Sequence, residues 1–221
     1  LVAGPSGVGK SGIMDMLFHH YCNITGENSD PGLRYTRNPF AKFWDGFQSC
    51  MHTVIFDDVA FMRPNGAPDP STLDFLQVIN MVPYCPDQAH LSEKGRTPLR
   101  ARLVLASTNV PHLHAYSYFA EPSAVQRRFP FIITPTPKPA FCKEGMLDIP
   151  PDVQPTAYPD WWDFKVERVT PRPADTRLGD PPVIRTVYSA ASTTELLQFL
   201  TKEILLFEAK QKKVSMTRDL Y

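Results

Sequence analysis

Residues 1–11 carry the residue types and spacing of a phosphate-binding loop. Gly4, Gly9, Lys10 and Ser11 satisfy the pattern G-x-x-x-x-G-K-[ST], with apolar residues on both sides. Glycines allow consecutive N–H groups to turn toward one anion, and a following helix adds its positive N-terminal end. We expect Lys10 to reach the β- and γ-phosphates of a nucleotide and the Ser11 hydroxyl to ligate Mg²⁺. The predicted nucleotide-binding loop is Gly4, Pro5, Ser6, Gly7, Val8, Gly9, Lys10 and Ser11; an ordinary glycine-rich turn is the alternative.

Two acids follow an apolar run at residues 53–58, Thr-Val-Ile-Phe-Asp-Asp. Such a run is typical of a parallel strand covered on both faces, which would deliver Asp57 and Asp58 to the carboxyl edge of the sheet, where ligands bind. One acid would hold Mg²⁺ through its water shell, and the other would orient an attacking water. We assign the metal to Asp57 together with Ser11, although the sequence leaves the roles of the two acids interchangeable. An exposed acidic turn is the alternative.

A second apolar run, residues 103–109, ends in Ser-Thr-Asn, and Arg127 and Arg128 precede a third run that reaches Ile133. A neutral amide at a strand end can hydrogen-bond a γ-phosphate and the attacking water without adding negative charge, so Asn109 is a candidate for that role. An arginine that reaches a γ-phosphate stabilises the charge that spreads during phosphoryl transfer. Taken alone, these residues would be a turn amide and a surface charge pair.

The positions of these residues predict an α/β fold. Lys10, Asp57 and Asn109 are about 50 residues apart, and each gap fits a helix and its connecting loops between strands of one parallel sheet. We predict helices over residues 11–21 and 71–82. Ser71 is the expected N-cap of the second helix, with Asp74 near the reciprocal position. Residues 63–70 are predicted to form a turn-rich loop.

Residues 22–50 are predicted to be irregular, because turn-forming residues are frequent there. An aromatic cluster at residues 35–47 is interpreted mainly as core packing. Arg37 and Lys42 within it could instead face a nucleotide or a neighbouring subunit.

Residues 83–102 are polar and then basic. Four cations lie within nine residues around Gly95, which predicts a protruding hairpin or loop. Lys94 and Arg96 are the candidate contacts to nucleic-acid phosphates. A solvated surface loop fits the same residues equally well.

The composition limits the class of protein. The formal net charge is zero, with 23 basic and 23 acidic residues, so contact with nucleic acid requires a local basic patch. The four cysteines form no C-x-x-C pair, which favours reduced thiols over a zinc site or a disulfide framework. No apolar run reaches the roughly 20 residues of a transmembrane helix, and no signal peptide is visible. The absent initiator Met and the short first strand lead us to expect a fragment of a longer polypeptide.

The motifs in this order resemble the superfamily 3 helicases, which are AAA+ ATPases of picornavirus-like positive-strand RNA viruses. The resemblance covers about residues 1–135. It rests on Gly-Pro-Ser-Gly-Val-Gly-Lys-Ser (4–11), Phe-Trp-Asp-Gly-Phe (43–47), Val-Ile-Phe-Asp-Asp (54–58), Leu-Ser-Glu-Lys-Gly (91–95), Ala-Ser-Thr-Asn (106–109) and Val-Gln-Arg-Arg-Phe (125–129).

This resemblance implies an AAA+ P-loop core with a central parallel sheet between helices, and a homo-oligomeric ring, a hexamer, that binds ATP between subunits. Lys94 would lie in the loop of the central pore and contact single-stranded RNA. Family members are parts of polyproteins, and they associate with intracellular membranes through upstream segments, which is an expectation about the parent protein. One subunit would supply Lys10, Ser11, Asp57, Asp58 and Asn109, and its neighbour would supply Arg127 and Arg128.

We divide the chain into an ATPase core at residues 1–137, a Pro-rich capping extension at 138–191 and an amphipathic helix at 192–213. Prolines are expected to prevent long regular elements in the extension. Its aromatic residues are expected to pack it against the core; they are Trp161, Trp162 and Phe164. Some picornaviral relatives carry a cysteine-rich zinc site in this region, but here it contains only Cys142, so we predict no zinc.

The final helix has a predicted capping box, formed by Ser192 and Glu195. Its apolar stripe packs either on its own domain or in a groove of a neighbouring subunit. A membrane-surface helix is the weakest alternative, because acidic residues interrupt the basic face. The stripe consists of Leu197, Leu200, Ile204 and Phe207.

Together these features predict an ATP-hydrolysing RNA helicase or translocase of a viral replication complex. It would use ATP and Mg²⁺ in the host cytoplasm, at intracellular membranes. Two alternatives share the nucleotide site: an ATPase that remodels membranes or acts as an RNA chaperone without unwinding, and a non-catalytic scaffold ordered by nucleotide. The paired acids and the arginines argue against the scaffold. A small-molecule phosphotransferase is the weakest alternative, because nothing resembles an acceptor pocket or a lid.

Overall fold

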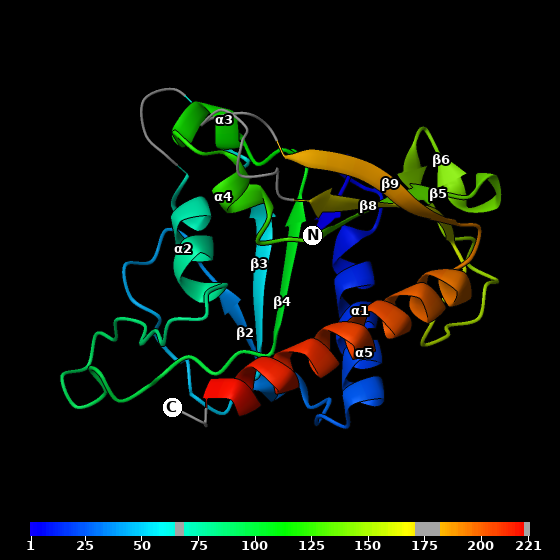
Figure 1. The fold of residues 1–221 in the computed structure, drawn as a ribbon. Coiled ribbons are helices and arrows are strands. Elements are labelled where there is room, and N and C mark those ends of the chain that lie inside the picture. Colours follow the sequence, from blue (N-terminus) through cyan, green and yellow to red (C-terminus); the bar gives the residue numbers. More distant parts are fainter. Residues whose placement is uncertain (65–68, 171–181, 219–221) are drawn as a thin grey trace.

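The computed structural model describes residues 1–64, 69–170 and 182–218, and it contains helices packed on both faces of a large sheet (Figure 1). Within these residues the sheet has seven strands in the order β2-β3-β4-β1-β5-β8-β9, and β6 and β7 form a separate hairpin. The strands are β1 (Val2–Ala3), β2 (Arg34–Arg37), β3 (Thr53–Val59), β4 (Leu103–Thr108), β5 (Phe131–Pro137), β6 (Cys142–Lys143), β7 (Met146–Leu147), β8 (Trp162–Thr170) and β9 (Val183–Ala190). The helices are α1 (Lys10–Thr25), α2 (Pro70–Val78), α3 (Ala115–Tyr118), α4 (Ser123–Gln126) and α5 (Thr193–Arg218), with 3-10 turns η1 (Pro31–Leu33) and η2 (Pro139–Phe141).

Five neighbouring strands run parallel, from β2 through β3, β4 and β1 to β5. Apolar residues cover both faces of β3 and β4, as expected for parallel strands. In Figure 1 the arrowheads of β3 and β4 point to the same end of the sheet, near α3 and α4. The predicted α/β class is confirmed, although the sheet is mixed because β8 pairs antiparallel with both β5 and β9.

Three strands of the seven-stranded sheet lie in segments that the sequence predicts to be irregular. β2 forms within residues 22–50, where it pairs with β3 at the edge of the sheet. β8 and β9 form within residues 138–191, so the expectation that prolines prevent long elements there is wrong. The physical reason is local, because neither of these two strands contains a proline. The predicted loop at 63–70 and the predicted extension include residues 65–68 and 171–181, which lie outside the described residues.

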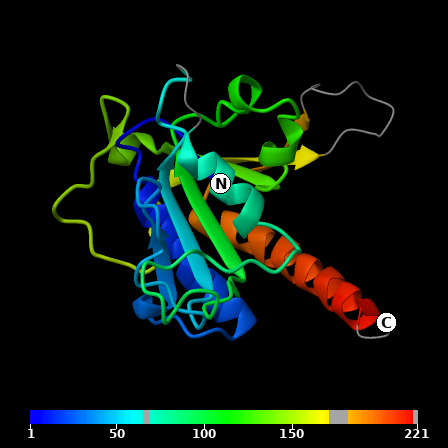
Figure 2. The same cartoon turned by 90° about the vertical axis from the view of Figure 1, so that its left-hand side faces the viewer.

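Alternate residues of β3 and β4 contribute to two cores on opposite faces of the sheet. Ile55 and Leu105 pack in the core that α1 and α5 cover. Val54, Phe56 and Ala106 pack in the core that α2 covers. In Figure 2, α2 lies in front of the strands. The period of two residues along each strand therefore produces a three-layer arrangement.

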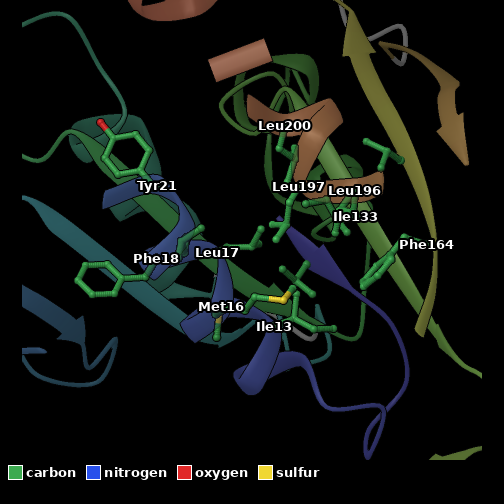
Figure 3. Packing of buried hydrophobic residues seen from close by; sticks show 14 of the residues in the cluster. Ile13, Met16, Leu17, Phe18, Tyr21, Ile133, Phe164, Leu196, Leu197 and Leu200 are labelled. Atoms are coloured by element: carbon green, nitrogen blue, oxygen red, sulfur yellow. The ribbon is translucent and has the colours of Figure 1, made fainter. Parts of the chain in front are cut away.

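Helix α1 lies at the centre of the first core. It extends to Thr25, beyond the predicted end at residue 21, because Gly26 is where the chain turns to a left-handed conformation (φ 75°) and caps the helix. Figure 3 shows Leu17 of this helix next to Leu197 of α5, and Ile13 lies one turn away in the same core. Trp162 and Phe164 are buried in the same core and Trp161 packs against it, as predicted.

Helix α2 has a different cap from the one predicted. The Asp69 carboxylate, rather than Ser71, caps the helix, accepting a hydrogen bond from the Ser71 N–H at 3.0 Å, and the helix ends at Val78 instead of residue 82. Asp74 takes no part in capping, because it forms an ion pair with Arg37 at 2.8 Å.

The aromatic segment at residues 35–47 packs in the second core, as predicted for most of its rings. Trp44 and Phe47 are buried there, and Arg37 lies over the Trp44 ring. Because Arg37 is buried and paired with Asp74, it is not available to a nucleotide or a neighbouring subunit. Phe40 is an exception and is exposed.

Helix α5 begins with the two residues of the predicted capping box, although Glu195 pairs with the N–H one residue before Ser192. The Glu195 N–H donates to the Ser192 hydroxyl oxygen at 3.2 Å, and the Glu195 carboxylate accepts from the Ala191 N–H at 2.8 Å. The first half of the helix packs on its own domain through Leu197 and Leu200. Phe207, in the same predicted stripe, is 58% exposed, and this part of the helix projects beyond the sheet in Figure 2. Among the described residues, no helix combines the length and the apolar character needed to cross a membrane.

Candidate nucleotide-binding site

The loop between β1 and α1 leaves the first N–H groups of α1 without a side-chain cap. Gly9 is the N-cap and has a left-handed backbone (φ 87°), and Gly7 is left-handed as well (φ 81°). The Gly4 N–H donates to the Thr108 carbonyl at 3.0 Å, which fixes the start of the loop to the end of β4. Uncapped N–H groups at the positive end of a helix form a site that suits a phosphate.

Lys10 lies inside this loop and connects it to the next strands. Its ammonium donates to the carbonyls of Gly4 and Pro5, both at 2.9 Å, and to the Asn109 amide oxygen at 2.7 Å. The Asn109 amide nitrogen donates in turn to the Asp58 carboxylate at 3.1 Å. Burial lowers the pKa of Lys10, while the nearby charges of Asp58 and Asp57 act in the opposite direction. Lys10, Asn109 and Asp58 thus form one hydrogen-bonded chain at the carboxyl edge of the sheet.

A β-bulge presents the two acids at the end of β3. The pairing with β4 shifts register between Phe56 and Val59, and Asp58 has a left-handed backbone (φ 48°). Ser107 lies opposite this bulge and is buried. Its hydroxyl donates to the Asp57 carboxylate at 2.6 Å and accepts from the Asp58 N–H at 2.8 Å. One serine therefore fixes both the carboxylate of the first acid and the backbone of the second.

Ser11 and Asp57 border the same open groove of about 260 Å³, which Asp15, Arg34 and Thr36 also line. Ser11 and Asp57 are exposed at this edge. Within the described part of the chain, no three His, Cys, Asp or Glu side chains gather to hold a metal ion by themselves. A hydroxyl and one carboxylate beside a phosphate site fit Mg²⁺, which usually retains several waters and takes its other ligands from phosphates.

Arg127 and Arg128 do not join this network. They follow α4, where Arg127 is exposed and Arg128 is half-buried. The Arg128 Nε is buried without a hydrogen-bond partner, and burial together with the Arg127 charge lowers the pKa of Arg128. Among the described residues, neither arginine forms a salt bridge.

Lys94 and Arg96 lie at the opposite edge of the sheet. Residues 83–102 contain no strand. The segment is therefore a loop, one of the two predicted forms, and not a hairpin. The loop returns to the sheet where the Arg102 N–H donates to the His52 carbonyl at 2.8 Å, just before β3 and β4 begin. Both basic side chains are exposed. In Figure 1 this loop extends away from the end of the sheet where α3 and α4 lie.

The comparison with protein families identifies the family of the chain. Residues 1–110 match the model of the RNA helicase family. The chain belongs to this family. The predicted resemblance to superfamily 3 helicases is therefore confirmed, and so is the prediction of a nucleoside-triphosphate hydrolase, because these helicases use nucleoside triphosphates.

Relatives of this helicase are viral polyproteins. The chain is 33% identical to the genome polyprotein of human rhinovirus A serotype 89 over 155 residues, which are 70% of this chain and 6% of the polyprotein. It is 30% identical to the genome polyprotein of Cosavirus A over 156 residues, 70% of this chain and 7% of that protein. It is 29% identical to the replicase polyprotein of acute bee paralysis virus over 113 residues, 48% of this chain and 6% of that protein. The helicase thus corresponds to a small part of each relative's length.

Sequence reasoning missed two side chains that contact the predicted site residues of this helicase. Ser107 lies two residues before Asn109, and the alternation along β4 could have indicated that the two side chains lie on the same face of the sheet. Trp162 donates its indole N–H to the carbonyl of Val8 in the phosphate-binding loop, at 2.7 Å. Nothing in the local sequence of Trp162 indicates this contact, since 154 residues separate the two partners.

Proposed function

We propose that this RNA helicase domain hydrolyses ATP with Mg²⁺ at the interfaces of a homo-oligomeric ring, and that hydrolysis drives single-stranded RNA through the ring. The observation that supports this most directly is the series of hydrogen bonds from Lys10 through Asn109 to Asp58. Asp57 lies next to this series and accepts a hydrogen bond from Ser107. These side chains supply a cation, a neutral amide and two carboxylates at one edge of the sheet, which is the set of groups that phosphoryl transfer to water requires.

Each residue of the set has a distinct task in this proposal. Lys10 moves from the carbonyls of Gly4 and Pro5 to the β- and γ-phosphates, where it neutralises their charge. Ser11 and Asp57 hold Mg²⁺, which supplies charge stabilisation to the phosphates when it is bound. Asp58 accepts a proton from, or orients, the attacking water, and Asn109 hydrogen-bonds the γ-phosphate. This division of the acids is supported by the groove that Ser11 and Asp57 share and by the bond between Asn109 and Asp58.

Arg127 and Arg128 serve the nucleotide of a neighbouring subunit in this proposal. Two adjacent cations without a carboxylate partner in the described chain are suited to an anion from elsewhere. The Arg128 guanidinium remains protonated even with its pKa lowered, so it would stabilise charge on a γ-phosphate, and Arg127 beside it would add a second cation. An interface of this kind joins unlike surfaces, and such head-to-tail contacts form a ring when the rotation between subunits closes. We propose a closed ring of six subunits.

Lys94 and Arg96 contact the RNA backbone in this proposal. Both side chains are exposed, and because the overall charge of the chain is neutral, contact with phosphates requires a local group of cations such as this loop. Replacing both residues with alanine should weaken RNA binding and remove stimulation of the ATPase by RNA, while the basal ATPase stays unchanged. Unchanged RNA affinity and unchanged stimulation would exclude this loop as the RNA contact.

We further propose that the parent polyprotein acts in a viral replication complex in the host cytoplasm, at intracellular membranes. The relatives with 70% coverage of this chain are genome polyproteins of viruses, which supports a role in replication. Membrane association would come from other parts of the polyprotein.

ATPase activity measured against protein concentration tests the proposed function. Specific activity should rise with concentration for the wild type, because the site is completed between subunits. Arg128→Ala should lower it about 1000-fold, the size of effect that an arginine supplied in trans produces. Arg185→Ala, which changes an exposed arginine of β9, is the matched control and should behave as the wild type. Activity independent of both concentration and Arg128 would indicate a self-contained site and exclude the ring mechanism.

A further inference from the structure

The outer side of the phosphate-binding loop is held by two backbone carbonyl contacts. The Leu147 N–H of β7 donates to the Gly7 carbonyl at 2.9 Å. The Trp162 indole N–H, at the start of β8, donates to the Val8 carbonyl at 2.7 Å. Both donors lie beyond residues 1–110, the part of the chain that matches the helicase family.

These two contacts determine where the neighbouring N–H groups point. A trans peptide unit is planar, so its carbonyl and its N–H point in opposite directions. The Gly7 carbonyl shares a peptide unit with the Val8 N–H, and the Val8 carbonyl shares one with the Gly9 N–H. Because both carbonyls are held from outside, both N–H groups are directed to the inner side of the loop, where a phosphate would accept hydrogen bonds from them.

The fit between the loop and these residues is close. A Cβ atom on Gly9 would lie 2.8 Å from the Leu147 side chain and 2.9 Å from the Trp162 ring. A Cβ atom on Gly7 would lie 2.8 Å from Met146. The glycines therefore allow left-handed backbone conformations and also allow Met146, Leu147 and Trp162 to approach the loop.

Trp162 is itself fixed by the core. Its side chain is 2% exposed and packs in the cluster that α1 and α5 share. Its backbone pairs with Pro137 at the end of β5. The donor to the Val8 carbonyl thus has little freedom to move, so it can hold the loop in one conformation before a nucleotide arrives.

We propose that Trp162 is a positioning residue for nucleotide binding: its indole N–H, together with the Leu147 N–H, holds the phosphate-binding loop with its N–H groups directed at the phosphates. This inference rests on the proposed nucleotide site and extends it to residues outside the family match. The inference predicts different effects on different nucleotides, because the N–H groups of the loop bind the α- and β-phosphates. Loss of the indole donor should weaken the binding of ADP, which has a β-phosphate, much more than the binding of AMP.

The test measures ADP and AMP affinities by isothermal titration for the wild type and for Trp162→Phe. We expect ADP affinity to fall roughly five- to tenfold, the range for one hydrogen bond, and AMP affinity to change less than about twofold. Trp161→Phe is the matched control, because the Trp161 ring packs on the core and against the Trp162 ring but, among the described residues, forms no side-chain hydrogen bond to the loop. It should leave the ADP-to-AMP ratio unchanged. RNA affinity should be unchanged in both variants.

A second variant separates the hydrogen bond from the packing. Replacing the indole of Trp162 with benzothiophene, which has nearly the same shape but no N–H, should reproduce the loss of ADP affinity while the unfolding temperature stays near that of the wild type. A wild-type ADP-to-AMP ratio in this analogue would overturn the inference, even if Trp162→Phe failed to fold. If the wild-type protein itself bound no ADP, the proposed nucleotide site would fall, which is a distinct outcome.

Discussion

Ser107 is the residue on which the geometry of the paired acids depends most. Its hydroxyl lies between the Asp57 carboxylate and the Asp58 N–H, and the β-bulge places both acids opposite this one serine. A hydrogen bond to a charged group contributes about 1.5–3 kcal/mol, more than most neutral ones. Ser107 therefore keeps Asp57 turned toward the groove that it shares with Ser11.

Ser107→Ala should lower the kcat of ATP hydrolysis roughly 10- to 100-fold, because Asp57 and Asp58 lose their common partner. The KM for ATP should change little, since the loop and Lys10 remain intact. Steady-state kinetics measure both quantities. Ser117→Ala, at an exposed position of α3, is the control and should leave kcat unchanged. A normal kcat in Ser107→Ala would contradict the positioning role of this serine.

The sequence predicts the position of Lys10, Asp57 and Asn109 at one edge because each follows an apolar run, and parallel strands deliver their ends to the same edge. It does not predict Ser107 or Trp162. A buried serine inside an apolar strand resembles any small core residue, and the contact of Trp162 with Val8 depends on how two distant strands meet.

At the scale of the elements, the two halves of α5 have different surroundings. Leu200 is buried against α1 and the sheet, whereas Leu206 is about half exposed. Leu200→Ala should lower the free energy of unfolding by about 2–4 kcal/mol, because it leaves a cavity between the helices. Leu206→Ala should change it by less than about 0.5 kcal/mol. Urea unfolding at matched protein concentration measures the difference, and equal effects of the two substitutions would exclude the packing described for α5.

The contact between α1 and α5 should also respond to pH through His20. Its Nε2 lies 2.8 Å from the Thr201 hydroxyl, and burial lowers its pKa from 6.5, against a smaller opposing effect of the Leu197 backbone. Below pH 6.5 the unfolded chain therefore binds the proton more readily than the folded chain, so stability should decrease as the pH falls through this range.

His20→Gln should make the unfolding temperature less sensitive to acid between about pH 7.5 and 5.5. His90→Gln, at an exposed position of the basic loop, should leave the sensitivity as it is in the wild type. Differential scanning fluorimetry across this pH range measures the unfolding temperature of each variant. An acid sensitivity in His20→Gln equal to that of the wild type would show that His20 does not couple the helix contact to pH.

Some elements of the fold can be predicted from the sequence, and others cannot. The helix after the phosphate-binding loop and the strands β3 and β4 follow from strong periodicity and apolar runs. β8 and β9 were missed because the high proline content of the segment hid two proline-free stretches. The cap of α2 was misplaced because Asp69 and Ser71 are both good capping residues, and only the backbone geometry shows that Asp69 holds the first turn.

In the whole molecule, the sheet separates two functions that the proposed mechanism must couple. The nucleotide site lies at the carboxyl edge, and the loop with Lys94 and Arg96 lies at the amino edge, joined by β3 and β4. Because neighbouring arginines would respond to the nucleotide, movement between subunits is the direct route by which hydrolysis could displace the basic loops and the RNA that they hold.

Mixing two inactive variants tests the central claim, that each site is completed by a neighbour. Lys10→Ala lacks a working loop but retains Arg128, and Arg128→Ala has the complementary defect. In an equal mixture about a quarter of the interfaces would combine an intact loop with an intact arginine, so ATPase activity should recover to roughly that fraction of the wild type. Recovery is the predicted result. A mixture as inactive as its two components, under conditions in which both proteins co-assemble, would contradict a site shared between subunits.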